Sequence, residues 1–260
     1  MTPSSKARTE LLADGQLLRL TLAAPKANVL DRAMVSELVA ALDHHGASPR
    51  LKAILLSADG PHFSFGASVA EHRKEEVRGM LADFHHLFRR LAELAIPTVA
   101  AVRGACLGGG LELAAWCSWI VAAPDAGFAQ PEIKLGVFAP LASLLLPWRL
   151  GGGAALDLLV SGRTIDAPTA ARIGLVHAVA DDPVAAAMAF AAEHLLPRSA
   201  SSLRFAERAA RHELAELLAR RLPALEALYL DQLMETADAN EGLAAFIAKR
   251  PPRWAAEERP

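Results

Sequence analysis

The chain has little of several features that would assign a protein to a specialised class. Only two of its 260 residues are cysteine, too few for a disulfide framework or a zinc knuckle, so we expect a reducing compartment, the cytoplasm. Aromatic residues make up 5% of the chain and the formal net charge is −2, so we expect no nucleic-acid partner. The nine histidines form no HExxH pattern and no compact cluster with carboxylates, so we predict no metal site.

The sequence also gives little indication of a secretory signal or a membrane-spanning segment. The amino-terminal sequence is MTPSSKARTE, which has no apolar core, so a secretory signal is not expected there. Residues 105–124 are nearly free of charge, but a central Glu112 and a run of glycines penalise insertion into a bilayer. We expect this segment to be a buried helix followed by a strand, and we expect no membrane partner.

What the chain does have is enough apolar sequence for a large core, since 53% of its residues are hydrophobic. In the first half two patterns alternate, strands over 17–23, 51–58 and 98–102 and helices over 32–45, capped by Asp31, and 73–94. This alternation predicts parallel strands joined by helical crossovers. The second half is typical of helices, over 141–160, 184–196, 200–221 and 223–247, with a short strand near 175–180.

Three consecutive glycines, Gly108 to Gly110, lie between the strand 98–102 and an apolar helix that begins near Gly109. A helix amino terminus has free N–H groups and the positive end of the helix dipole, and glycine lets a ligand approach the backbone. Neither a phosphate loop nor a dinucleotide-binding fingerprint is present. Two interpretations stay open, a tight turn packed against a sheet and a turn that binds negative charge.

Two glutamates, Glu112 and Glu132, have apolar neighbours. Enclosure raises the pKa of a carboxyl group and suits it to proton transfer near neutral pH. A simpler interpretation of Glu112 is an acidic residue that complements the dipole of its own helix. No single helix brings two residues this far apart together, so a catalytic pair depends on the tertiary fold.

The sequence CLGGGLELA, followed by FAQPEIKLG, resembles the crotonase, or enoyl-CoA hydratase/isomerase, superfamily. Other segments agree in order over about residues 15–250, namely PKANVLD, HFSFGASV, SGRTIDAPTAARIGLVHAV and EGLAAFIAKR. The resemblance implies an α/β fold, a crotonase-like ββα superhelix with a carboxyl-terminal helical region used in trimerisation. We expect the core with the acyl-CoA site over 1–195 and the helical region over 196–260, in a homo-oligomer that is a trimer or a dimer of trimers.

The resemblance also implies roles for individual positions. It implies a coenzyme A thioester as substrate, an oxyanion hole made by the amides of Ala67 and Gly109, and a catalytic water held by Glu112 and Glu132. Which glutamate is acid and which is base stays open. No cofactor is implied, because coenzyme A is part of the substrate. The positions expected to bind the substrate and its coenzyme A are Lys26, Ala27, Gly66, Ser68, Gly108 and Pro131, although an exposed lysine is as often merely solvated.

The chain departs from straight-chain hydratases at two places. It has APLASLLLPWRL over 139–150 instead of a glycine-rich turn, and Ser68 instead of the usual aspartate. Its segments FSFGASVAEH and LGVFAP resemble a narrower group, the cyclohexa-1,5-diene-1-carbonyl-CoA hydratases of anaerobic benzoyl-CoA breakdown, which add water 1,4 across a cyclic dienoyl thioester. The residues expected to shape a flat acyl pocket, with ordinary core packing as the alternative for each, are Phe63, Phe65, Phe138 and Pro140. The alternatives for function are a general trans-2-enoyl-CoA hydratase and a non-catalytic binding member of the superfamily.

Overall fold

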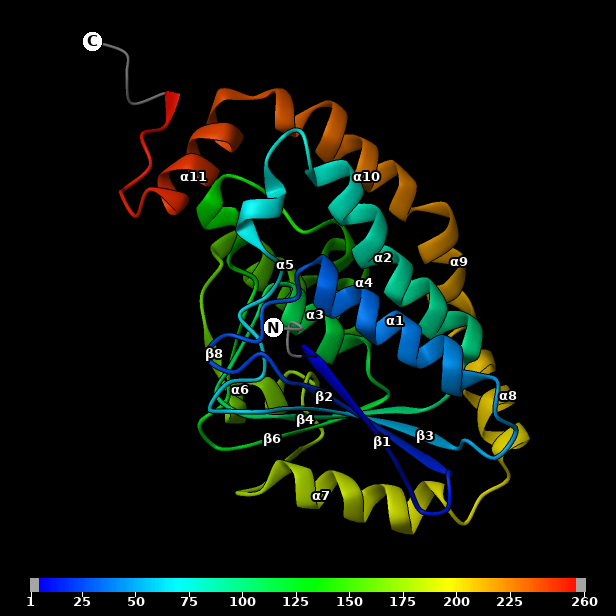
Figure 1. Ribbon diagram of the computed structural model, residues 1–260. Helices are drawn as coiled ribbons and strands as arrows, with labels where there is room; N and C mark the ends of the chain where they lie inside the picture. The colour runs from blue at the N-terminus through cyan, green and yellow to red at the C-terminus, as the bar shows by residue number, and fades with distance from the viewer. Residues whose placement is uncertain (1–4, 256–260) are drawn as a thin grey trace.

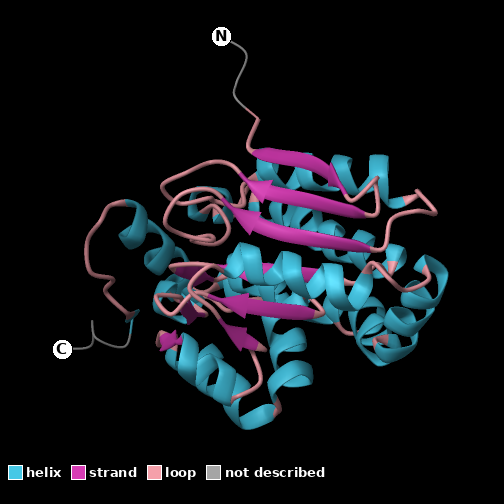
Figure 2. Cartoon of the chain, turned by 90° about the horizontal axis from the view of Figure 1, so that it is seen from below, coloured by secondary structure: helices cyan, strands magenta, loops and turns pink. Residues whose placement is uncertain are grey.

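Parallel apolar strands form most of a six-stranded sheet, with the strand order β1-β2-β3-β4-β6-β9 (Figure 2). Its parallel strands are β2 (Leu17–Leu22), β3 (Ala53–Ala58), β4 (Thr98–Val102), β6 (Trp119–Ala122) and β9 (Ala178–Val179). In this computed structural model residues 5–255 are described. Outside them lie residues 1–4, the start of the segment where no signal was expected, and 256–260, the end of the predicted helical region.

Helices cover both faces of this sheet, as the alternating pattern predicts. Figure 1 shows α1 (Arg32–Gly46), α2 (Val77–Leu94) and α3 (Gly109–Trp116) on one face and α7 (Pro183–Phe190) on the other. Asp31 caps α1 as expected, since its side chain accepts a hydrogen bond from the amide of Met34. The strands are therefore buried from two sides, which explains why β3 and β4 are almost continuously apolar.

A second, three-stranded sheet lies next to the first and positions the site. It consists of β5 (Ala105–Leu107), β7 (Gly127–Ala129) and β8 (Ile165–Asp166), of which β5 and β7 are parallel. A short 3-10 helix, η2 (Pro131–Leu135), follows β7 directly. No pattern predicted these strands, because two or three residues are too few to show an alternation.

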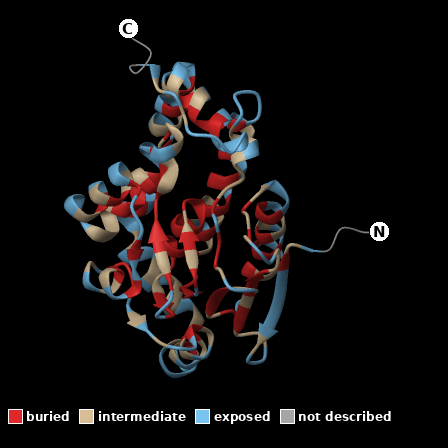
Figure 3. Cartoon of the chain, turned by 90° about the vertical axis from the view of Figure 1, so that its left-hand side faces the viewer, coloured by how far each residue is buried: buried red, intermediate tan, exposed pale blue. Residues whose placement is uncertain are grey.

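Several predicted elements differ from those observed. Strand β1 (Ala7–Leu12) was not predicted, because this edge strand exposes Arg8 to Glu10 and carries no apolar alternation (Figure 3). The helix predicted over 73–94 begins only at Val77, after the 3-10 helix η1 (Val69–His72). The strand predicted near 175–180 is limited to β9, and the short helix α6 (Ala167–Arg172) before it was not predicted.

The long predicted helices are interrupted. The one over 141–160 is split at Gly151, where φ is 76°, into α4 (Pro140–Leu150) and α5 (Gly152–Ser161). The segment 184–196 is α7 followed by a π-helical turn, η3 (Ala191–Leu195). The remaining helices are α8 (Ala200–Ala210), α9 (His212–Arg220), α10 (Leu222–Asp231), η4 (Leu233–Glu235) and α11 (Ala237–Ile247).

The carboxyl-terminal helices pack on the core of their own chain. Helices α9 and α10 contact α4, and α11 contacts both η1 and η2. Gly242 of α11 lies so close to the Leu135 carbonyl that a Cβ atom would collide with it. The helical region thus covers the turn that carries Glu132. Within residues 5–255, no helix combines the length and apolar character needed to cross a membrane.

Two arginines hold the carboxyl end of α3. The Arg149 guanidinium of α4 donates to the carbonyls of Ala115 and Cys117, each at 2.8 Å, and Arg211 donates to that of Trp116 at 2.6 Å. Positive charge at this end complements the helix dipole and satisfies the last carbonyl groups. The unusual segment 139–150 therefore has a structural purpose, since it supplies Arg149.

We expect Arg149→Ala to lower the free energy of unfolding by about 3 kcal/mol, because it removes charged hydrogen bonds and leaves buried carbonyls unpaired. Urea denaturation followed by circular dichroism measures this. The control is Arg163→Ala, which removes an exposed ion pair with Asp157 and should change stability little. Equal effects of the two substitutions would contradict the role assigned to Arg149.

Candidate active site

The loop before η1 runs alongside β5 and is fixed there by backbone and side-chain hydrogen bonds. The Ser64 amide donates to the Ala105 carbonyl at 3.0 Å, and the Leu107 amide donates to the Ser64 carbonyl at 2.9 Å. The Ser64 hydroxyl donates to the Asn28 carbonyl at 2.8 Å and accepts from the Gly66 amide at 3.0 Å. The position of Gly66 is thus set from two sides.

Asn28 and Ser64 are positioning residues that the sequence did not indicate. The Asn28 amide group donates to the carbonyls of Asp59 and His62, both at 2.9 Å, and Asn28 itself adopts a left-handed φ of 44°. Both side chains are fully buried. An asparagine in the turn after Pro25 was the available signal, because asparagine tolerates this conformation and bonds to nearby backbone.

The amides of Ala67 and Gly109 lie side by side, because glycines let the two turns touch. At Gly66, where φ is 94°, a Cβ atom would lie 2.8 Å from the Leu107 carbonyl oxygen and 3.1 Å from the Gly109 nitrogen. A Cβ atom on Gly109 would lie 3.1 Å from the Ala67 nitrogen. Within residues 5–255, neither N–H group has a protein acceptor. Two free donors at a helix amino terminus form a place for negative charge.

The other interpretation of the glycine run, a tightly packed turn, applies to Gly110. A Cβ atom on Gly110 would lie 2.6 Å from the Ser64 Cβ atom, so this glycine is required by packing. Gly108 has a φ of 52° and leaves room for Glu132, whose Oε1 atom lies 2.5 Å from the position that a Cβ atom would take. The three glycines therefore serve three purposes.

The two glutamates come from different elements and lie near enough for the charge of Glu132 to act on Glu112. Glu112, in the first turn of α3, is 5% exposed, and its Oε1 atom accepts a hydrogen bond from the Ala142 amide at 2.7 Å. Glu132 comes from η2, and its Oε2 atom is buried without a protein partner in the described chain. Its other oxygen lies against Gly108, at the start of α3.

The surroundings favour a proton on this pair near neutral pH. Burial, together with the neighbouring charge of Glu132, raises the pKa of Glu112 to about 8, against the opposing effect of the Ala142 hydrogen bond. Burial also raises the pKa of Glu132 to about 7. Because each carboxyl affects the other, we assign the shared proton to the pair. One proton on two carboxyls provides an acid and a base in one site.

The other positions expected to bind substrate lie at different depths around these groups. Lys26 is exposed, at a φ of 108° that residues other than glycine rarely adopt. Ala27 is half-buried, and its carbonyl accepts from the Phe65 amide at 2.8 Å. Ser68 and Pro131 are half-buried, directly before η1 and at the start of η2. Their roles in binding substrate stay predictions.

The four residues expected in the acyl pocket divide into two groups. Phe63 has no exposed surface and belongs to the main core, so ordinary core packing describes it, whereas Phe65 is 44% exposed with its edge toward His62. Phe138 and Pro140 follow η2 and precede Ala142, the hydrogen-bond partner of Glu112. Phe138 packs against the main core and contacts Tyr229, and Pro140 is buried at the start of α4, so core packing describes these two as well.

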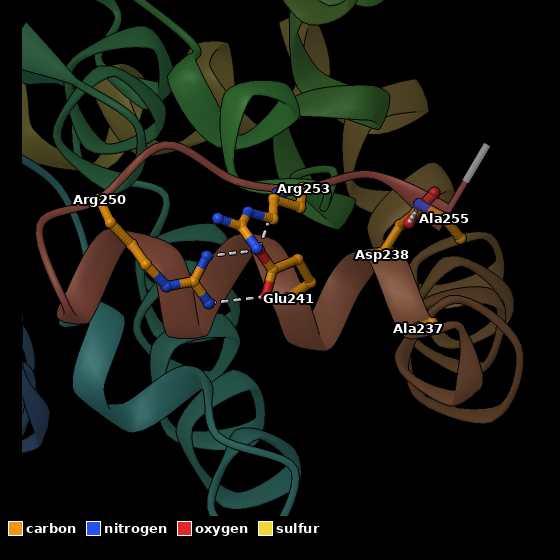
Figure 4. Close-up of a pocket in the computed structure, with 6 residues that line it drawn as sticks. All are labelled: Ala237, Asp238, Glu241, Arg250, Arg253 and Ala255. Carbon is orange, nitrogen blue, oxygen red and sulfur yellow. Dashed lines mark hydrogen bonds and ion pairs between the residues drawn. The ribbon is translucent and has the colours of Figure 1, made fainter. Parts of the chain in front are cut away.

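A hollow of about 470 Å³ lies between α11 and the segment that follows it (Figure 4). Its polar groups satisfy one another, since Glu241 accepts from the Arg250 guanidinium at 2.6 and 2.7 Å and from the Arg253 amide at 2.8 Å. The segment also brings Trp254 against Gly136, at the end of η2. We therefore interpret this region as a brace for the turn that carries Glu132.

Comparisons with known proteins identify the family of the chain. Residues 13–257 match the family described as enoyl-CoA hydratase/isomerase. The chain is 52% identical over 251 residues to a cyclohexa-1,5-dienecarbonyl-CoA hydratase of Thauera aromatica, covering 96% of this chain and 97% of the relative. It is 37% identical over 240 residues to a probable enoyl-CoA hydratase of Mycobacterium bovis, covering 90% and 93%.

Solved structures show the same fold. A crystal structure of an enoyl-CoA hydratase from Mycobacterium avium superposes with a TM-score of 0.86 at 28% identity and covers 96% of this chain and 99% of its own. The predicted crotonase-like α/β fold is thereby confirmed. The superposition extends over nearly the whole chain and so includes the carboxyl-terminal helices. The chain belongs to the enoyl-CoA hydratase/isomerase family.

Proposed function

We propose that the protein is a hydratase that adds water 1,4 across cyclohexa-1,5-diene-1-carbonyl-CoA and gives 6-hydroxycyclohex-1-ene-1-carbonyl-CoA. The observation that carries this proposal is the enclosed pair Glu112 and Glu132 beside two free backbone amides. Such a site combines proton transfer with stabilisation of negative oxygen. The name of the Thauera aromatica relative supports the cyclic dienoyl substrate.

The amides of Ala67 and Gly109 receive the thioester oxygen. Attack on a conjugated thioester moves negative charge onto this oxygen, and two prepositioned N–H donors stabilise it by roughly 3–4 kcal/mol each. Gly66 and Gly109 let the oxygen reach both donors, because neither has a side chain between the turns. Glu112 lies in the first turn of the same α3 helix, so the reacting carbons come close to it.

The glutamates move the protons of the added water. One ionised carboxyl takes a proton from water. At the same time the water oxygen bonds to the ring carbon β to the carbonyl. The electrons of that double bond move through the ring toward the thioester oxygen and give a dienolate. The protonated carboxyl then delivers its proton to the far end of the diene, and a ring double bond conjugated with the carbonyl is restored. The carboxyls end with their protonation exchanged, and water has been added in full.

This reaction transfers no electrons to or from a carrier, so the proposal includes no redox cofactor, and coenzyme A enters with the substrate. We place the enzyme in the cytoplasm, as the small number of cysteines suggests. We also propose a trimer or a dimer of trimers, assembled with the help of the region beyond residue 196.

The first prediction concerns the substrate. Purified protein given cyclohexa-1,5-diene-1-carbonyl-CoA and crotonyl-CoA separately should show the higher kcat/KM with the cyclic thioester, because the Thauera aromatica relative that is 52% identical is named for this substrate. Loss of the dienoyl absorbance and chromatography of the hydroxy product measure the rates. A much faster turnover of crotonyl-CoA would favour a general enoyl-CoA hydratase instead.

The second prediction concerns the glutamates. Glu112→Gln and Glu132→Gln should each lower kcat for hydration by at least about 100-fold while thioester binding persists, because an amide cannot carry the proton. Steady-state kinetics and calorimetric binding of the saturated cyclohexanecarbonyl-CoA measure the two effects. Glu37→Gln is the control, since this carboxyl accepts hydrogen bonds from the Ser5 hydroxyl and from the amides of Lys6 and Ala7, at the amino end of β1. Wild-type rates in both site variants would indicate a non-catalytic member of the superfamily.

The third prediction concerns pH. Because one carboxyl must be ionised and the other protonated, kcat/KM should be highest between about pH 7 and pH 8. At lower pH both carboxyls hold protons and neither accepts one from water, and at higher pH neither has one to give. Rates measured over about pH 5.5 to 9.5 test this. A flat profile over that range would rule out the shared proton.

A further inference from the structure

A buried hydroxyl group from the helical region lies beside the glutamates and has no assigned role. Tyr229, on α10, is the only tyrosine of the chain and is 1% exposed. Its hydroxyl has no hydrogen-bond partner within residues 5–255. A buried unpartnered hydroxyl costs free energy that phenylalanine would avoid, so its presence calls for an explanation.

Tyr229 belongs to the space that holds the glutamates. Its ring packs edge-to-face on Phe138, with 5.4 Å between ring centroids, and Phe138 lies between η2 and α4. Burial raises the pKa of Tyr229, and the charge of Glu132 raises it further, so the phenol stays neutral and keeps its proton. The Glu132 Oε2 atom is likewise buried without a partner. Both polar atoms thus lack partners within residues 5–255, and the charge of Glu132 acts on the phenol.

We propose that Tyr229 is a third catalytic group of this site, whose phenol O–H donates a hydrogen bond to the oxygen that is added to the substrate. This inference rests on the proposed hydration. The oxygen has four directions for bonds. One lone pair attacks the ring carbon and its two hydrogens face Glu112 and Glu132, which leaves one lone pair free to accept from Tyr229. In the product the same phenol donates to the new hydroxyl group.

This role explains why the donor is a phenol and why it is neutral. A hydroxyl with a raised pKa donates but does not compete with the glutamates for the proton of water. Tyr229 comes from α10, which packs against α4, and α4 also supplies the Ala142 amide to Glu112. The helical region would therefore complete the site, in addition to any part in assembly.

The test compares Tyr229→Phe with a matched loss of a buried hydroxyl elsewhere. We expect Tyr229→Phe to lower kcat at least about 10-fold without lowering Tm, because the hydroxyl has no protein partner to lose. Thr21→Val is the control, since its buried hydroxyl contacts that of Ser57 at 3.1 Å, far from the site. It should lower Tm and leave kcat unchanged. A wild-type kcat in Tyr229→Phe would overturn the proposal.

Measurements of thioester binding distinguish a Tyr229 that contacts the added oxygen from one that only packs in the core. Tyr229→Phe should weaken binding of the hydroxy product about 10-fold and leave that of cyclohexanecarbonyl-CoA, which has no hydroxyl, unchanged. Equal effects on both thioesters would overturn the proposal. Because the chain has one tyrosine, the wild-type enzyme labelled with ¹³C at the phenol carbon gives a single NMR signal. The chemical shift of that signal should change when the hydroxy product binds and not when the saturated thioester binds. A change with the saturated thioester alone would also overturn the proposal.

The same comparison distinguishes this inference from the proposed function. If the wild type hydrates crotonyl-CoA and not the dienoyl thioester, the substrate assignment fails, and Tyr229→Phe is then measured with crotonyl-CoA and its 3-hydroxy product. If Glu112→Gln and Glu132→Gln abolish hydration while Tyr229→Phe behaves as wild type, only the role of Tyr229 fails.

Discussion

The site depends on the contact between two backbone turns that have no side chains between them. Gly66 touches Leu107 and Gly109, and Gly109 in turn touches Ala67. A Cβ atom on Gly66 or Gly109 would push the two turns apart, and with them the amides of Ala67 and Gly109. The surrounding structure maintains this contact, since β5 fixes one turn and the hydrogen bonds of Ser64 fix the other. Electrostatic stabilisation by fixed donors requires such preorganisation, because donors that must move first stabilise less.

Helix α3 combines two electrostatic tasks at its two ends. Its carboxyl end meets Arg149 and Arg211, so the negative end of the dipole is compensated inside the protein. Its amino end keeps an amide free for a ligand oxygen. Glu112 lies in the first turn but bonds to the amino end of α4 instead of its own. Glu112 is thus tied to α4 and not to the amides of its own helix.

The sequence predicted the parts of the structure that depend on local pattern. Asp31 capped its helix as expected, and the continuous apolar runs became parallel strands. The meeting of Glu112 with Glu132 required the tertiary fold, because β6 and β7 lie between them in the chain. Phe63 was expected in the acyl pocket but lies in the core, because the residue type alone does not distinguish a pocket wall from the core. The sequence around Tyr229 indicated no role for it, because its surroundings form only where α10 packs against α4.

The burial of two carboxyls has a consequence for the evolution of such chains. Protons that the unfolded chain would release above about pH 4.5 stay bound in the native site, so the acidic pair opposes folding as pH rises through about 7 and 8. A member of the lineage that no longer needed the reaction would gain robustness by exchanging these acids for apolar or amide side chains. The two buried acids therefore lower the stability of this chain at neutral pH, and an apolar or amide side chain at either position would remove that penalty.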